Sequence, residues 1–285
     1  MENNIKIIEC PRDAMQGLHT FIPTELKAEY MNLLLKVGFD TLDFGSFVSP
    51  KAIPQMRDTA QVLDLLDLDD TATKLLAIVA NKRGAVDAAS FEQIRYLGYP
   101  FSISETFQMR NTNATIEASL ERVKVIQDIC LKNNKELVVY ISMGFGNPYG
   151  DEWNAEIVQH WTEVLHGLDI KILSLSDTVG VANPDTIAYI FSNLIEKYPT
   201  IEFGAHLHTT PDTWREKVVA AYENGCRRFD GALKGFGGCP MAKDDLTGNM
   251  PTENMIDYFN EVNEKLGFDV NMLNQSLTKT FSVFP

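Results

Sequence analysis

The sequence predicts an α/β fold of the (β/α)8 TIM-barrel type, with the active site at the C-terminal ends of the strands. Short apolar segments alternate with longer amphipathic segments eight times, and no linker, low-complexity stretch or change of composition interrupts the 285 residues. Eight such units in a chain of this length are what this barrel requires. An open, doubly wound sheet is the alternative, but no glycine-rich fingerprint follows the first strand, as a nucleotide-binding sheet of that kind would need.

The predicted strands are brief, apolar and bounded by turn residues. We expect strands at residues 5–9, 41–47, 74–80, 100–105, 136–143, 170–175, 201–208 and 227–233. Residues 11–23 are expected to form a turn and a polar connection. Apolar residues three or four positions apart, with glycine or proline near several ends, predict the helices. These are expected at residues 24–37, 50–67, 91–97, 113–132, 155–168, 184–197, 213–224 and 253–266. The whole chain, residues 1–285, is expected to be one catalytic domain with a short C-terminal extension from about residue 267.

Charge and composition limit the function. The 25 basic residues are outnumbered by 39 acidic ones, giving a net charge of −14, which argues against nucleic acid as a partner because phosphate binding needs a basic patch. No run of about 18 apolar residues occurs, so we expect no membrane span. The first residues lack a secretory signal, which indicates a cytoplasmic protein with reduced cysteines.

Two histidines in the seventh predicted strand are the first candidate metal ligands. His206 and His208 are separated by one residue, and strand side chains alternate faces, so both point the same way. Two neutral imidazoles at that spacing can hold one divalent cation. The alternative is that one is a packed core residue and the other caps a strand end.

Oxygen donors near two other strand ends could complete this site. Asp13 follows the first strand and Asn249 follows the eighth, although either could simply be a turn residue. One carboxylate, two imidazoles and one amide form a set that suits Mg²⁺ or Mn²⁺ and contains no thiolate.

Catalytic candidates also lie at strand ends. Arg12 cannot lose its proton there and could stabilise an oxyanion such as an enolate, unless it forms only a surface salt bridge. Cys239 lies on a glycine-rich loop, where a thiol could deliver a proton, whereas the thiols of Cys130 and Cys226 are expected to be packing residues. The remaining polar residues at strand ends are Asp43, Ser46, Glu105 and Asp177.

These motifs, in this order, resemble hydroxymethylglutaryl-CoA lyase. The resemblance extends from about Ile5 to Tyr258. It is carried by Pro11-Arg12-Asp13, Ser46-Phe47-Val48-Ser49-Pro50-Lys51, Pro54-Gln55-Met56, Ser104-Glu105-Thr106-Phe107, Ser176-Asp177-Thr178-Val179-Gly180, His206-Leu207-His208, Gly237-Gly238-Cys239-Pro240-Met241-Ala242-Lys243 and Gly248-Asn249. Arg-Asp and His-x-His are shared with a wider group of metal-dependent synthases and aldolases.

The resemblance implies roles for individual residues. Asp13, His206, His208 and Asn249 match metal ligands, while Arg12, Cys239 and Asp177 match catalytic residues. His206 is a further candidate for the base. Gln16 matches a glutamine near the metal, and we expect Gln16, Asp43, Ser46 and Glu105 to bind substrate. The family has glutamate where Asp43 stands.

The leading hypothesis is an oxo-acid lyase that uses Mg²⁺ or Mn²⁺ for retro-Claisen cleavage of a 3-hydroxy-acyl-CoA such as 3-hydroxy-3-methylglutaryl-CoA, giving acetyl-CoA and acetoacetate. One alternative is a related aldolase or acyl-CoA condensing synthase acting on a 2-oxo acid. A non-catalytic barrel that binds a ligand is a further alternative. The expected partner is a small acyl-CoA or hydroxy acid, and we expect a homo-oligomer.

Overall fold

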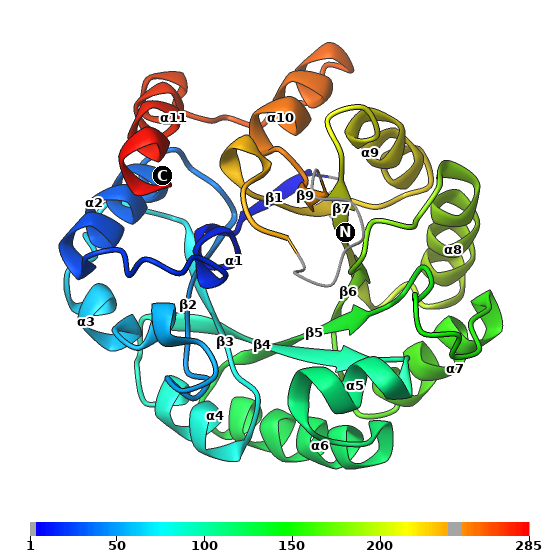
Figure 1. The fold of residues 1–285 in the computed structure, drawn as a ribbon. Helices are drawn as coiled ribbons and strands as arrows, with labels where there is room; N and C mark the ends of the chain where they lie inside the picture. The colour runs from blue at the N-terminus through cyan, green and yellow to red at the C-terminus, as the bar shows by residue number, and fades with distance from the viewer. Residues whose placement is uncertain (1–3, 239–246, 285) are drawn as a thin grey trace.

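Eight parallel strands close into a barrel in the computed structural model, which describes residues 4–238 and 247–284 (Figure 1). Consecutive strands pair in parallel, and β8 pairs with β1, which closes the sheet. This confirms the predicted (β/α)8 barrel. The strands are β1 (Lys6–Glu9), β2 (Thr41–Ser46), β3 (Lys74–Ile78), β4 (Ile94–Ser102), β5 (Glu136–Ser142), β6 (Ile172–Asp177), β7 (Glu202–Thr209) and β8 (Arg228–Gly231).

Helices surround the barrel (Figure 1). Five of them begin after an Asn, Ser or Thr whose side chain accepts a hydrogen bond from a backbone N–H of the first turn, which satisfies a group that the helix itself leaves open. The helices are α1 (Pro11–Gln16), α2 (Thr24–Leu35), α3 (Thr59–Asp64), α4 (Lys82–Ala89), α5 (Glu105–Thr112), α6 (Ile116–Lys132), α7 (Ala155–His166), α8 (Pro184–Lys197), α9 (Trp214–Glu223), α10 (Thr252–Glu261) and α11 (Val270–Val283), with 3-10 turns η1 (Pro54–Met56) and η2 (Leu233–Gly235). Among the described residues, no helix is long and apolar enough to cross a membrane.

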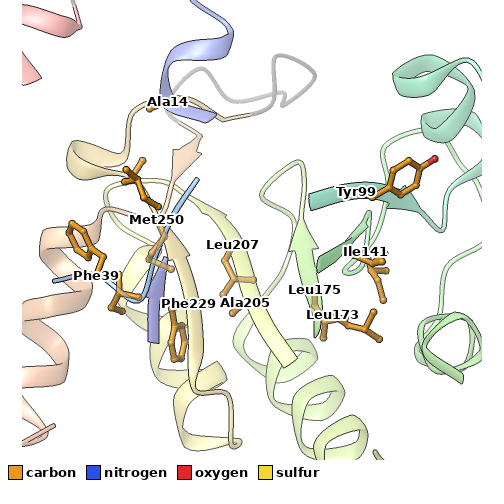
Figure 2. Packing of buried hydrophobic residues seen from close by; sticks show 14 of the residues in the cluster. Ala14, Phe39, Tyr99, Ile141, Leu173, Leu175, Ala205, Leu207, Phe229 and Met250 are labelled. Atoms are coloured by element: carbon orange, nitrogen blue, oxygen red, sulfur yellow. The ribbon is translucent and has the colours of Figure 1, made fainter. Parts of the chain in front are cut away.

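The alternation of side chains along the strands divides the buried residues into two groups. The larger group packs between the strands and the helices; Figure 2 shows Ile141 of β5 with Leu173 and Leu175 of β6 in this layer. The smaller group fills the barrel interior. Its members are Leu76, Ile78, Tyr96, Val138, Tyr140 and Ile172. The interior is therefore a packed core, and we expect functional side chains at the C-terminal end of the barrel.

The predicted helix at residues 91–97 is wrong, and the predicted strand at residues 100–105 begins too late. β4 already starts at Ile94, and α4 lies earlier in the chain. Gly98 suggested a helix end, but it lies within β4, where an added Cβ would lie 2.5 Å from Cδ1 of Ile78. Glycine fits at this position because a larger side chain would clash in the crowded barrel interior. It does not interrupt the strand.

Three further elements differ from expectation. The turn expected after β1 is the short helix α1, with Pro11 at its start. The helix predicted from residue 113 begins at Ile116, because Asn113 has a left-handed conformation that ends α5 and Thr115 caps α6. The expected C-terminal extension contains α11, which packs against α2.

A ninth strand, β9 (Gly248–Asn249), lies at the C-terminal end of the barrel. It pairs antiparallel with β7, with His208 opposite Asn249 and Thr209 opposite Gly248. This pairing brings the segment after β8 directly beside the two histidines.

Candidate active site

A cavity of about 330 Å³ opens at the C-terminal ends of the strands. Its lining includes five of the residues singled out from the sequence. These are Arg12, Asp13, Gln16, His206 and His208. The strands and α1 thus bring together side chains that are nearly 200 positions apart in the chain, at the end of the barrel where this fold places its active sites.

His208 is oriented by the loop after β6. Its Nδ1 lies 2.8 Å from the carbonyl oxygen of Thr178, so Nδ1 carries the hydrogen and Nε2 is left with a free lone pair. Nε2 is buried and has no hydrogen-bond partner among the described residues. Burial, followed by the charge of His206, lowers the pKa of His208, which favours the neutral imidazole that metals bind.

His206 is oriented by a carboxylate of β8. Its Nδ1 lies 3.1 Å from Oδ2 of Asp230, so Nε2 is the nitrogen available to the cavity. Burial by itself lowers the pKa of His206, but Asp230 and Asp13 raise it overall. A carboxylate behind a histidine is the usual support for a metal-binding imidazole.

Asp13 completes a compact group of possible ligands. One ligand atom from each of Asp13, His206 and His208 lies within 4.8 Å of the others. The amide nitrogen of Asn249 donates to Oδ2 of Asp13 at 2.9 Å and to the carbonyl oxygen of Phe236 at 2.8 Å. Burial alone would raise the pKa of Asp13, but Arg12 and the two histidines hold it at about 2.

These residues fit a divalent cation. The unpartnered, buried Nε2 of His208 is a costly feature unless a cation or a polar ligand satisfies it. The ionised carboxylate of Asp13 and the Nε2 atom of His206 lie beside it. Neutral imidazole and carboxylate oxygen are the donor types that Mg²⁺, Mn²⁺ and related ions accept.

Arg12 is held against this group by three side chains. Its Nη1 donates to Asp13 at 2.9 Å and to Gln16 at 2.8 Å, while Nε donates to Asp43 at 3.0 Å. Asp43 and Asp13 raise the pKa of Arg12 although burial opposes this, so the guanidinium stays charged. Burial raises the pKa of Asp43 to about 6, although Arg12 acts against the rise. Gln16 also donates to Asp13 at 2.7 Å, which links all four residues.

Five of the predicted site residues that the structure describes do not line the cavity. Two of them, Asp43 and Asn249, contact Arg12 and Asp13 instead. The hydroxyl of Ser46 accepts from the backbone N–H of Val48 at 3.2 Å. Glu105 is the first residue of α5, and its carboxylate accepts from the N–H of Ile116 at 2.9 Å. The fifth is Asp177.

The carboxylate of Asp177 binds the ammonium group of Lys217 at 2.7 Å. Cys239, the predicted proton donor, lies outside the described residues.

The structure adds functional neighbours that the sequence reasoning missed. Asp230 could have been found by the same alternation that identified the histidines, because it shares the inward face of β8 with Arg228. Tyr140 lines the cavity, and its ring meets that of His206 edge-on with the centroids 5.6 Å apart. Its buried hydroxyl has no hydrogen-bond partner in the part of the chain that the structure describes. The Thr178 carbonyl, a backbone group, gave no signal in the sequence.

Known proteins are similar to this chain over most of its length. The HMGL-like family model matches residues 4–280. A relative named hydroxymethylglutaryl-CoA lyase YngG, from Bacillus subtilis (strain 168), is 33% identical over 249 residues, covering 86% of this chain and 81% of the relative. These matches confirm the resemblance found in the motifs.

Solved structures are similar over nearly the whole chain. The HMG-CoA lyase from Brucella melitensis has a TM-score of 0.90 and 28% identity, covering 98% of both chains. An HMG-CoA lyase from Acinetobacter baumannii, solved with coenzyme A and 3-methylmalate, has a TM-score of 0.89 and 30% identity, covering 99% of this chain and 91% of that one. The chain therefore belongs to the HMGL-like family.

Proposed function

We propose that this protein is a metal-dependent carbon–carbon lyase that cleaves 3-hydroxy-3-methylglutaryl-CoA to acetyl-CoA and acetoacetate. The observation that carries the proposal is the convergence of Asp13, His206 and His208 beside Arg12 in one cavity. The names of the relatives support it, as does the relative that was solved with coenzyme A and 3-methylmalate.

Asp13, His206, His208 and Asn249 would hold Mg²⁺ or Mn²⁺. For Asn249 the ligand would be the amide oxygen, since its nitrogen already donates to Asp13 and Phe236. Such an ion supplies Lewis-acid polarisation and lowers the pKa of a bound hydroxyl group. The protein contributes the fixed orientation of the ligands, through Thr178 behind His208 and Asp230 behind His206.

His206 is predicted both as a metal ligand and as the base, but only one of its ring nitrogens is available for either role. Its Nδ1 is bound to Asp230, so only Nε2 can act. We assign Nε2 to the metal, because the carboxylate behind the ring matches that role. Asp13 is the one carboxylate among the described residues that line the cavity, but its pKa of about 2 makes it a poor proton acceptor, so we keep it as a ligand alone. With Asp177 bound to Lys217, the proton of the substrate hydroxyl would leave to solvent.

The next step breaks the bond between C2 and C3 of the substrate. The electron pair moves to the thioester as an enolate, and C3 becomes the ketone of acetoacetate. Arg12, fixed by Asp43 and Gln16, donates hydrogen bonds to the enolate oxygen. The thiol of Cys239, assigned from the sequence, then protonates C2 to give the methyl group of acetyl-CoA.

Gln16 and Asp43 would affect substrate binding through their contacts with Arg12 and Asp13. The substrate contacts expected of Ser46 and Glu105 stay predictions, as do a cytoplasmic location and a homo-oligomer. An aldolase or condensing synthase has less support, since the curated relatives reported above carry a lyase name.

A thioester panel tests the proposal. Metal-stripped protein, with and without Mn²⁺, is incubated with 3-hydroxy-3-methylglutaryl-CoA, with 3-hydroxybutyryl-CoA, and with acetyl-CoA plus a 2-oxo acid. We expect acetyl-CoA and acetoacetate from the first substrate alone, and only with Mn²⁺. Condensation of acetyl-CoA with the 2-oxo acid would support the synthase instead. Metal binding without any turnover would support the non-catalytic barrel.

A matched pair of variants tests the role of His206. If Nε2 is a ligand, His206→Ala loses Mn²⁺ affinity along with turnover. If His206 is the base, the same variant retains Mn²⁺ affinity and loses turnover alone. Asp230→Asn, which keeps the size of the supporting side chain, should weaken Mn²⁺ binding about 10- to 100-fold under the ligand assignment.

A further inference from the structure

Lys217, on α9, is almost completely buried behind the candidate metal site. Its exposed fraction is 2%. Nζ donates to Oδ2 of Asp177 at 2.7 Å, to the carbonyl oxygen of His208 at 2.8 Å and to the carbonyl oxygen of Gly180 at 3.2 Å. The three acceptors match the three hydrogens of the ammonium group.

These contacts fix the loop that orients His208. The second oxygen of Asp177 accepts from the backbone N–H of Ala182 at 3.1 Å, so the carboxylate closes the loop while Lys217 anchors it. Within that loop lies the Thr178 carbonyl that binds Nδ1 of His208. Lys217 therefore holds both the backbone of His208 and the segment that sets the rotation of its ring.

The same anchor lies behind the strand that carries Asn249. β9 pairs with the end of β7 at His208, whose carbonyl oxygen Lys217 binds. Gly180 has φ +74°, and a Cβ at this position would lie 2.8 Å from Cγ2 of Thr247. The anchored loop thus packs closely against the residue that precedes β9.

We propose that Lys217 and Asp177 form a positioning pair that sets the geometry of the metal ligand His208, an inference that rests on the proposed metal site. Asp177 is absent from the cavity lining, so its carboxylate acts through Lys217 and the loop, without touching substrate. A buried ion pair is weak evidence for stability, since an apolar pair of similar volume often replaces one without loss. Its value here is that it fixes one arrangement of His208.

The chain offers a matched control in Lys27 and Asp58. This pair is also buried, with side chains 1% and 9% exposed, and its Nζ–Oδ1 distance is also 2.7 Å. Lys27 donates to the carbonyl oxygen of Gln55 as well. Lys27 joins α2 to the segment before α3, and its hydrogen bonds to described residues include none to a predicted metal ligand.

The test compares Asp177→Asn/Lys217→Met with Asp58→Asn/Lys27→Met. Both double variants remove a buried charge pair without leaving either charge alone. Mn²⁺ affinity is measured by electron paramagnetic resonance titration of free Mn²⁺, and folding by near-ultraviolet circular dichroism and thermal unfolding. We expect the first variant to bind Mn²⁺ about 10- to 100-fold more weakly. The control should match the wild type in Mn²⁺ affinity, even where its melting temperature falls.

A folded Asp177→Asn/Lys217→Met protein with wild-type Mn²⁺ affinity would overturn the positioning role and leave the metal site standing. A wild-type protein that binds no Mn²⁺ would overturn the metal site itself, so the two failures are distinguishable. If the double variant does not fold, Asp177→Asn decides, because its Lys217 keeps both carbonyl partners. Weakened Mn²⁺ binding in that variant supports the role, and unchanged binding overturns it.

Discussion

Replacing Arg12 by Met tests whether this side chain stabilises charge that forms only during the reaction. The guanidinium is already fixed by Asp13, Asp43 and Gln16 before substrate enters, so it pays no reorganisation cost in the transition state. Loss of one such donor typically lowers kcat by about 10²- to 10³-fold, or roughly 2.7–4 kcal/mol. We therefore expect a fall in kcat of at least about 10²-fold with little change in KM.

The same substitution also removes the cation from two buried carboxylates, and this effect must be separated from catalysis. Arg12 helps to hold the pKa of Asp13 at about 2, although burial opposes it, so in Arg12→Met protons compete more strongly with the metal. Kinetics are therefore measured at saturating Mn²⁺, after its affinity for the variant has been determined. Asp43→Asn is the matched control, because it keeps the Arg12 guanidinium but weakens the contact that holds it in place. The kcat of this variant should fall less than that of Arg12→Met. An unchanged kcat with a raised KM in Arg12→Met would refute the reasoning and make Arg12 a substrate-binding residue only.

Three other predictions follow from the site and its surroundings. His208→Ala and Asp13→Ala should each abolish tight Mn²⁺ binding while circular dichroism shows an intact fold; unchanged affinity in both would remove the metal assignment. Cys239→Ser should keep metal and substrate binding but lose most turnover, whereas Cys226→Ser, which alters a buried thiol, should behave as wild type; equal rates in all three proteins would make Cys239 a packing residue. Burial raises the pKa of Glu9 to about 8, so between about pH 4.5 and 8 the folded chain holds a proton that the unfolded chain lacks, and stability falls as pH rises. Between pH 6 and 8 this group should cost the wild type roughly 2 kcal/mol of unfolding free energy, at 1.36 kcal/mol per pKa unit and with the folded group half deprotonated at pH 8. Urea unfolding of Glu9→Gln should show a decline smaller by that amount, and parallel pH profiles would contradict it.

The alternation of side chains along strands accounts for most of what could be predicted about the site. It placed His206 and His208 on one face, and that face is the inner one that opens to the cavity. Applied to β6, the same rule separates Ser176, which lines the cavity, from the adjacent Asp177, which does not. Position after a strand end was therefore a weaker guide than the face on which a side chain lies.

Other features depend on tertiary contacts that a single sequence does not display. Gly98 suggested a helix end because its close contact with Ile78 of the neighbouring strand β3 was not visible. The burial of Lys217 could not be anticipated either, because its partners are a carboxylate and two carbonyl groups from other segments. The fold was predictable because the alternation of strand and helix repeats eight times, so an error in one element does not change the overall pattern.

Cleavage in D2O tests the central claim most directly. Mn²⁺-loaded protein is given 3-hydroxy-3-methylglutaryl-CoA in D2O, and the products are analysed by mass spectrometry, with a chelator-treated sample as control. A lyase that protonates a thioester enolate from an exchangeable group should yield equal amounts of acetoacetate and acetyl-CoA, with one deuterium in the new methyl group. The chelated sample should yield neither product. Absence of acetyl-CoA in the loaded sample, or equal cleavage after chelation, would contradict the account.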